Sequence, residues 1–404
     1  MNVLVLDGNQ NQAVASVRSI AGAGHRVFVG EAAPWSKASW SRACSGIFRY
    51  PSPHEAVGPF VQAIAGFVRE KPGTLVLPMT EATTLSLSAN RDVLMPAGAQ
   101  LVLPGHDNLL RAFDKKETTR LAEKLGIAVP KTVVVTSLEQ ACDAGHQLRY
   151  PIVLKALSSE ECLPNGKLRT TGRPCYANDP GECDKAYRGI SQRSSAVLFQ
   201  EFVEGEGTGY FALMRNGELR AEFAHRRIRD VHPTGSGSAV RVSVPIDAEI
   251  RRASLAILSA LRWHGVAMVE YRQKAGSPAV FMEVNGRFWH SLALACYAGV
   301  DFPAMLVKMA ESGDVGMNPG YRSGIRCRWF LGDVRHLIEV WKGRPPGYAG
   351  AYPDRLRTLL QVITPVRGTY HDLFQWRDPL PELGDWGNAF MRLASPPPSF
   401  KNKT

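Results

Sequence analysis

The chain has 404 residues, of which 45% are hydrophobic and 21% charged, proportions typical of a globular protein with room for two or three domains. No apolar run is long enough to span a membrane, and the N-terminal MNVLVLDG lacks the basic segment of a signal peptide, so a cytoplasmic protein without a membrane partner is expected. The net charge of +11 favours anionic partners, but the arginines are dispersed and no nucleic-acid-binding motif is present, so a nucleotide or an acidic small molecule is preferred over nucleic acid.

Two further site classes find no support in the sequence. The seven cysteines are an odd number and form no CxxC pair, which argues against both a zinc site and a disulfide framework. The phosphate-binding Walker A pattern and the hydrolytic GxSxG and HExxH patterns are absent.

Residues 1–108 alternate between short apolar runs and helical patterns. Strands are expected near 3–6, 27–29 and 75–77, and helices near 11–22, 60–68 and 80–90. This rhythm predicts a parallel sheet covered by helices. The turn after the first strand resembles a dinucleotide fingerprint, with Glu31 as the ribose acid, but Gln10 replaces the glycine that lets the backbone approach a pyrophosphate, so nicotinamide binding is not expected. Glu81 begins the third helix, where it is favoured by the helix dipole or faces a substrate.

Beyond residue 109, a helix is expected to begin near Lys115, and a strand is expected to carry Lys155. Asp114 is the expected N-cap of the helix, because Glu117 lies three residues later. The run 150–156 is typical of a buried strand, and Lys155 is its one charged side chain. A buried ammonium group needs an anion, and a phosphate supplies one.

A hairpin is expected where Asn216-Gly217 separates two apolar runs at 210–214 and 219–225. Alternation through the following basic segment places His225, Arg227 and Arg229 on one face. The loop 235–238 is rich in glycine and serine and could close over a substrate, and Arg241 after it is a candidate for binding a carboxylate. A solvated basic strand is the alternative interpretation.

The most informative pattern is a hairpin expected at 266–273 and 279–286. Its turn, centred near Gly276, places Glu270 opposite Glu283, and alternation puts Phe281, Glu283 and Asn285 on one face. Opposed carboxylates destabilise a sheet unless a cation lies between them, and Mg²⁺ prefers carboxylate oxygens shared with substrate phosphates. Arg287 nearby could bind an anion through two hydrogen bonds. An edge hairpin with solvated acids is the alternative.

Four segments in order, FDKKETTRLAEKLGIAVPKT, YPIVLKA, VLFQEFVEG and FMEVNGRFW, resemble motifs of the ATP-grasp superfamily, and the last, with AGVDFP after it, resembles the carboxylate–amine ligase or carboligase-type branch. The resemblance covers about residues 1–310 and implies a fold of the α/β and α+β classes. Its expected parts are a Rossmann-like domain at 1–108, an ATP-grasp domain of two α+β subdomains at 109–312 with a lid at about 132–204, and a C-terminal extension at 313–404 with a disordered tail. The lid loop at 158–177 departs from the family pattern because it has only two glycines.

The resemblance also implies roles for individual residues. ATP and Mg²⁺, two ions in the family pattern with Mn²⁺ as a substitute, are the expected cofactors. The expected metal ligands are Glu270, Glu283 and Asn285. The expected nucleotide-binding residues are Lys115 and Lys155 at the phosphates, Gln200, Glu201, Phe202 and Val203 at the adenine hinge, where the backbone C=O and N–H of Glu201 and Val203 would read the base, and Glu206 at the ribose. An exposed turn glutamate is an equal reading of Glu206. The expected catalytic residues are Arg227 and Arg287, next to the transferred phosphoryl group.

The activity implied by the resemblance is ADP-forming ligation, in which ATP converts a carboxylate to an acylphosphate and an amine then displaces phosphate. Small-molecule carboxylates and amines are the expected partners, and a homodimer is one assembly to consider. Two alternatives stay open: a carboxylase of the same fold that activates bicarbonate, and a non-catalytic nucleotide-binding protein. The sequence does not resolve which acid or amine is used.

Overall fold

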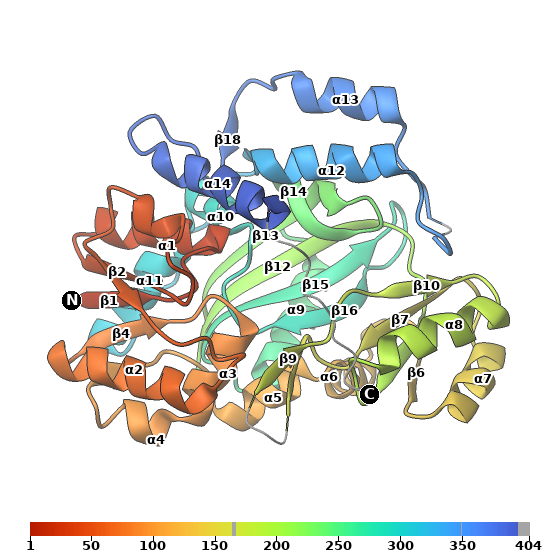
Figure 1. The fold of residues 1–404 in the computed structure, drawn as a ribbon, viewed down its shortest axis with the longest axis horizontal. Helices are drawn as coiled ribbons and strands as arrows, with labels where there is room; N and C mark the ends of the chain where they lie inside the picture. Colours follow the sequence, from red (N-terminus) through yellow and green to blue (C-terminus); the bar gives the residue numbers. More distant parts are fainter. Residues whose placement is uncertain (164–166, 349, 395–404) are drawn as a thin grey trace.

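The computed structural model describes residues 1–163, 167–348 and 350–394, and its elements fall into four regions (Figure 1). The N-terminal domain, red to orange, lies beside a large central sheet, and a smaller lid lies on the opposite side of that sheet. Blue helices of the C-terminal extension cover the top of the view. The disordered tail predicted at the C-terminus falls on 395–404, outside the described residues.

The N-terminal domain contains the predicted parallel sheet, in the order β3-β2-β1-β4-β5. Its central strands are buried on both faces, which explains their continuous apolar runs. The strands are β1 (Asn2–Val5), β2 (Arg26–Glu31), β3 (Gly46–Arg49), β4 (Thr74–Leu77) and β5 (Ala99–Gln100). The helices are α1 (Asn11–Gly22), η1 (Ala38–Trp40), α2 (Val57–Glu70), α3 (Glu81–Ala89) and α4 (Arg91–Leu94).

The Glu31 side chain is hydrogen-bonded to the backbone of the protein. Its carboxylate accepts hydrogen bonds from the backbone N–H groups of Asn9, Ala32 and Ala33. Glu31 therefore holds the loop after β1 in place, in keeping with the expectation that no nicotinamide cofactor binds there.

The lid is a four-stranded antiparallel sheet in the order β10-β7-β11-β6, with two helices packed on it. Its strands are β6 (Thr132–Val135), β7 (Ile152–Ala156), β10 (Cys175–Ala177) and β11 (Val197–Glu201), and its helices are α7 (Leu138–Gln147) and α8 (Pro180–Ser191). A separate two-stranded hairpin, β8 (Glu160–Cys162) and β9 (Leu168–Thr170), occupies the glycine-poor loop. Two helices lead into the lid, α5 (His106–Phe113) and α6 (Lys115–Lys124).

The central sheet has seven strands in the order β16-β15-β12-β13-β14-β17-β18. Five of them come from the predicted ATP-grasp region: β12 (Glu206–Arg215), β13 (Glu218–His232), β14 (Ser236–Ser243), β15 (Gly265–Gln273) and β16 (Val280–Asn285). Helices α9 (Ala248–Ala260), α10 (Leu292–Ala298) and α11 (Phe302–Ser312) pack against them. Both predicted hairpins are confirmed by the antiparallel pairs β12–β13 and β15–β16.

The C-terminal extension completes this sheet and adds three helices. Its strands β17 (Arg326–Arg328) and β18 (Thr369–His371) extend the sheet beyond β14. Its helices are α12 (Phe330–Lys342), α13 (Arg355–Ile363) and α14 (Leu380–Ala394). Because one core cluster includes Val14, Phe223, Leu306 and Trp329, packing runs through all three predicted parts, and the boundaries at 108 and 312 stay predictions.

In the described part of the chain, no single helix is long and apolar enough to cross a membrane. The pair α10 and α11, bent by 86°, passes that test together, but its apolar side chains lie mostly in the core of the protein.

Candidate active site

Lys155 extends from β7 into the space between the lid and the central sheet. Its Nζ donates to Gln200 Oε1 at 2.9 Å, and Gln200 Nε2 donates to Thr132 Oγ1 at 3.0 Å, so neighbouring lid strands fix its position. Burial lowers the pKa of Lys155 to about 8, with Glu283 opposing that shift and Lys115 adding to it. The lysine is therefore a desolvated cation next to another cation, an environment that favours an anionic ligand.

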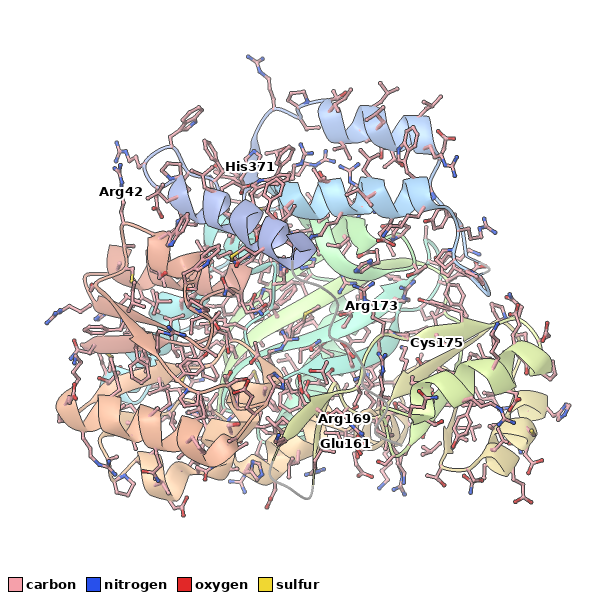
Figure 2. The ribbon with its side chains drawn as sticks, in the orientation of Figure 1. Arg42, Glu161, Arg169, Arg173, Cys175 and His371 are labelled. Carbon is pink, nitrogen blue, oxygen red and sulfur yellow. The ribbon has the colours of Figure 1, made fainter. Side chains whose placement is uncertain are left out.

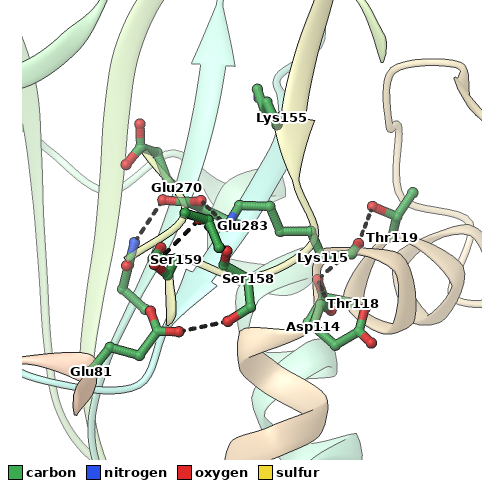
Figure 3. A network of polar contacts seen from close by, with 12 residues as sticks. Glu81, Asp114, Lys115, Thr118, Thr119, Lys155, Ser158, Ser159, Glu270 and Glu283 are labelled. Atoms are coloured by element: carbon green, nitrogen blue, oxygen red, sulfur yellow. Dashed lines mark hydrogen bonds and ion pairs between the residues drawn. The ribbon is translucent and has the colours of Figure 1, made fainter. Parts of the chain in front are cut away.

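Lys115 is the first residue of α6, and the local sequence determines its placement. The Asp114 carboxylate caps the helix by accepting from the N–H groups of Lys116 and Glu117, which confirms the predicted N-cap. The Lys115 N–H donates to Leu157 O just after β7, which ties the helix to the lid. Its Nζ lies 3.6 Å from Glu283 Oε2, as Figure 3 shows.

The two predicted carboxylates are paired across the hairpin, with Glu270 directly opposite Glu283. Arg227 Nη2 lies 2.8 Å from Glu270 Oε2, and Asn285 Nδ2 donates to Glu283 Oε1 at 3.1 Å. Burial acts to raise the pKa of Glu283, but Lys115, Lys155 and the Asn285 hydrogen bond outweigh it and lower that pKa. Glu283 is thus held as an anion among cations, and Glu270 pairs with a guanidinium group.

The prediction that Phe281 lies on the same face of this hairpin as Glu283 is wrong. A β-bulge between Glu270 and Tyr271 leaves Met282 as an extra residue, so Phe281 turns into the core with Val284. Met282 and Glu283 instead both line the cleft. The bulge thereby brings an apolar side chain beside the carboxylates.

Most of the predicted residues line one cavity of about 430 Å³ between the lid and the central sheet. A smaller cavity of about 150 Å³ adjoins it. The larger cavity is lined by Lys115, Lys155, Gln200, Glu201, Phe202, Val203, Arg227, Glu270 and Glu283. Asn285 and Arg287 line the smaller one.

Glu206 lines neither cavity. It lies at the exposed start of β12 and pairs with Arg226 at 2.7 Å. The structure therefore gives no support to Glu206 as a ribose ligand and favours its alternative reading as an exposed glutamate.

Fewer backbone groups of the hinge are available to bind adenine than predicted. The N–H of Glu201 donates to Lys131 O and that of Phe202 to Pro151 O, so the predicted use of the Glu201 N–H for adenine is wrong. The Glu201 carboxylate accepts from the backbone N–H of Arg149. Reading of the base by the C=O of Glu201 and the N–H of Val203 stays a prediction.

Arg229, predicted on the same face as Arg227, and Arg241, predicted to meet a carboxylate, both pair with acids of the protein itself. Arg229 pairs with Asp333 of α12 at 2.6 Å, because bulges in the β13–β14 pairing change the register after Arg227. Asp230, rather than Arg229, lies beside Arg227, 3.5 Å from it. Arg241 does meet a carboxylate, but it is that of buried Asp372 from the extension.

The loop after Lys155 reaches the N-terminal domain. Ser158 donates to Glu81 Oε1 at 2.8 Å, as Figure 3 shows, and His54 lies 3.6 Å from Glu160. Ser158 lines the larger cavity, whereas Glu81 does not. Contacts from the N-terminal domain thus support the cavity wall where the family pattern has glycines.

Several cavity residues were not predicted. Arg272 follows Glu270 on the same strand face, where alternation predicts it, but it was not assigned to the site. Arg173 comes from the lid loop, at the junction between the lid and the central sheet (Figure 2). Glu339 and Tyr352 come from the extension and have no local sequence signal for this position.

The donor set suits a hard cation. Two opposed carboxylates and an amide oxygen are available at Glu270, Glu283 and Asn285. In the described residues no cluster of three or more His, Cys, Asp or Glu is suited to a metal, so phosphate oxygens would have to complete a coordination shell here.

No family model matches the chain. The curated proteins that are similar in sequence include the following two. The N-terminal section of the carbamoyl phosphate synthase large chain of Methanopyrus kandleri is 26% identical over 244 residues, which is 57% of this chain and 41% of that protein. D-alanine–D-alanine ligase of Acidovorax ebreus is 25% identical over 224 residues, 50% of this chain and 63% of the ligase. The matches thus span less than two thirds of these relatives.

Many solved structures share the fold, and three of them illustrate the likeness. An ADP complex of N5-carboxyaminoimidazole ribonucleotide synthetase superposes with a TM-score of 0.65 at 14% identity, covering 89% of this chain and 96% of that one. L-amino acid ligase from Bacillus licheniformis gives 0.60 at 15% identity, covering 77% and 74%. The biotin carboxylase domain of Hydrogenobacter thermophilus 2-oxoglutarate carboxylase, with MgADP and bicarbonate, gives 0.63 at 12% identity, covering 80% and 73%.

Proposed function

Because this chain has the ATP-grasp fold and its sequence relatives are ATP-grasp enzymes, we propose that it is an ADP-forming ligase that activates a carboxylate with ATP and joins it to an amine. The neighbours solved with ADP or MgADP support ATP and Mg²⁺ as its cofactors. Its substrates would be small molecules in the cytoplasm.

One observation carries this proposal: cations and carboxylates converge at one end of the larger cavity. Lys115 and Lys155 come from α6 and the lid, and Glu270 and Glu283 from the central sheet. Arg227 lies beside Glu270. Lysines suit the phosphate oxygens of ATP, and the carboxylates suit the cation that accompanies them.

The reaction would have two steps. A carboxylate oxygen of the acid attacks the γ-phosphorus, the bond to the β,γ-bridging oxygen breaks, and ADP leaves. The amine nitrogen then attacks the acyl carbon, phosphate leaves, and the amine loses a proton. When bound, Mg²⁺ would neutralise charge on the phosphate oxygens, and Glu270, Glu283 and Asn285 would hold it.

The protein's own contribution is positioning and charge neutralisation, since phosphoryl transfer needs little covalent help. Lys155 and Lys115 would orient the phosphate chain. Arg227 and Arg287, which line the smaller cavity, would stabilise negative charge on the transferred phosphoryl group.

A bicarbonate-activating enzyme is the second candidate. It is favoured by the small size of the inner cavity, about 150 Å³, beside the phosphate end. The chemistry at the γ-phosphorus is the same for both candidates.

Isotope transfer tests the first step. If an acid oxygen attacks the γ-phosphorus, ¹⁸O from a labelled carboxylate must appear in inorganic phosphate, and the nucleotide product must be ADP. The assay supplies ¹⁸O-labelled glycine, alanine, glutamate, lactate, pyruvate or bicarbonate with hydroxylamine as the amine, and mass spectrometry follows the label. AMP carrying the label would overturn the proposal, because it would show attack at the α-phosphorus.

Nucleotide binding is expected to weaken as the pH rises above about 8, the pKa of Lys155. A lysine with a lowered pKa is charged below that value, so above it the binding of phosphate must be accompanied by uptake of a proton. The ATP dissociation constant should therefore rise by up to about tenfold per pH unit. Calorimetry between pH 7 and 9.5, in buffers of different ionisation enthalpy, measures both quantities. Lys155→Gln should lose the proton uptake, and an unchanged uptake in that variant would assign it to another group.

A further inference from the structure

The smaller cavity shares a wall with the larger one. Arg227, Glu270 and Glu283 line both, so the smaller cavity begins where the cations and carboxylates converge. Its size, about 150 Å³, admits a molecule of only a few heavy atoms beside the phosphate end.

Among the described lining residues of this cavity, the carboxylates belong to the proposed Mg²⁺ ligands, so none is left for a substrate cation. The acidic residues of the cavity are Glu270 and Glu283, which pair with Arg227 at 2.8 Å and Lys115 at 3.6 Å. Burial lowers the pKa of both its histidines, His225 well below the usual value and His290 to about 3, so both imidazoles are neutral. An ammonium group in the cavity would find two guanidinium groups, of Arg227 and Arg287, and no free carboxylate among the described lining residues.

Four neutral polar groups of the lining have no hydrogen-bond partner among the described residues: Trp289 Nε1, Ser238 Oγ, His225 Nδ1 and His290 Nδ1. Trp289, Ser238 and His225 are only 2%, 7% and 1% exposed. The indole N–H can only donate, and leaving a buried donor unpaired is costly. The lining thus offers an obligate donor, the indole N–H, and a serine hydroxyl that can also donate, which suits a ligand with hydrogen-bond acceptor atoms.

We propose that the smaller cavity binds the acid that ATP activates, and that this acid carries no ammonium group. Its polar atoms outside the reacting carboxylate are oxygens, as in 2-hydroxy acids, 2-oxo acids and bicarbonate. This inference rests on the proposed function. An acid oxygen forms the bond to the γ-phosphorus as ADP leaves, and the amine enters afterwards from the larger cavity.

The test compares acids that differ in one group. Lactate and alanine, or glycolate and glycine, differ in a hydroxyl against an ammonium group, and pyruvate and bicarbonate complete the set. Each is given to the full-length enzyme with ATP, Mg²⁺ and hydroxylamine, and ADP release is measured above a control without acid. We expect at least about tenfold faster ADP release with the ammonium-free member of each pair, the ratio expected from roughly one or two unmatched polar contacts.

The results distinguish failure of this inference from failure of the ligase proposal on which it rests. Stimulation by lactate, glycolate or pyruvate supports the organic acid, and stimulation by bicarbonate alone supports the same cavity with the carboxylase chemistry. Equal or faster ADP release with alanine or glycine overturns the inference and leaves the ligase proposal standing. If no acid stimulates ADP release although ATP binds, the ligase proposal fails and the inference fails with it.

A variant pair tests the cavity itself. Trp289→Phe keeps the ring and removes the indole N–H, so the KM of the preferred acid should rise about tenfold while the KM of ATP stays within about twofold. Trp376→Phe, at a side chain that is 89% exposed, is the matched control. An unchanged acid KM in folded Trp289→Phe would remove the cavity from the acid site.

Discussion

The Glu283→Gln variant is expected to lose at least about 100-fold of its Mg²⁺-dependent ATP turnover, the magnitude of losing one electrostatic stabiliser. The substitution keeps the shape of the side chain and one acceptor oxygen, but it removes the charge opposite Glu270 and 3.6 Å from Lys115. ADP release at saturating ATP, measured across a range of Mg²⁺ concentrations, checks the result.

Glu123→Gln is the matched control, because Glu123 is exposed on α6, the helix that begins with Lys115. Its turnover should equal that of the unaltered enzyme. Circular dichroism should show both variants folded. Near-normal turnover in Glu283→Gln would remove Glu283 from the metal set.

The Lys155→Ala variant should bind ATP at least about 30-fold more weakly, because truncating one partner of a buried charged pair costs about 2 kcal/mol or more. Lys116→Ala should change the affinity by less than about twofold, since Lys116 is exposed and lines neither cavity. Calorimetry with ATP in the absence of an acid substrate measures both. Equal losses in the two variants would show that the phosphates lie elsewhere.

Much of the candidate site could be predicted because local patterns specify it. The short loop around Gly276 brings Glu270 close to Glu283, although their direct pairing also depends on the β-bulge at Met282. The cap at Asp114 locates Lys115, and the apolar run of β7 leaves Lys155 as its one charged residue. In each case, neighbouring residues in the sequence carry most of the signal.

The errors arise where one residue is inserted or where a partner is distant in the sequence. The bulge at Met282 reverses the face of Phe281, and bulges after Arg227 separate it from Arg229. Strict alternation cannot detect a bulge, because nothing in the residue types of the strand marks which residue is the extra one. Asp333 lies 104 residues from its partner Arg229, a separation that no local pattern encodes.

Two buried cations of the protein pair with carboxylates of the C-terminal extension, which the ribosome synthesises last. Buried Arg241 pairs with Asp372, 131 residues later, and buried Lys37 pairs with Asp385, 348 residues later. At roughly 5 to 20 residues per second, the ribosome delivers these carboxylates about 7 to 26 s and 17 to 70 s after their cations. Until then, neither cation has its counter-charge, and burying it alone would be strongly unfavourable. The N-terminal domain and the central sheet therefore reach their final packing only when residues 372 and 385 have left the exit tunnel, so synthesis, rather than the folding of separate domains, sets the earliest time at which the site is complete.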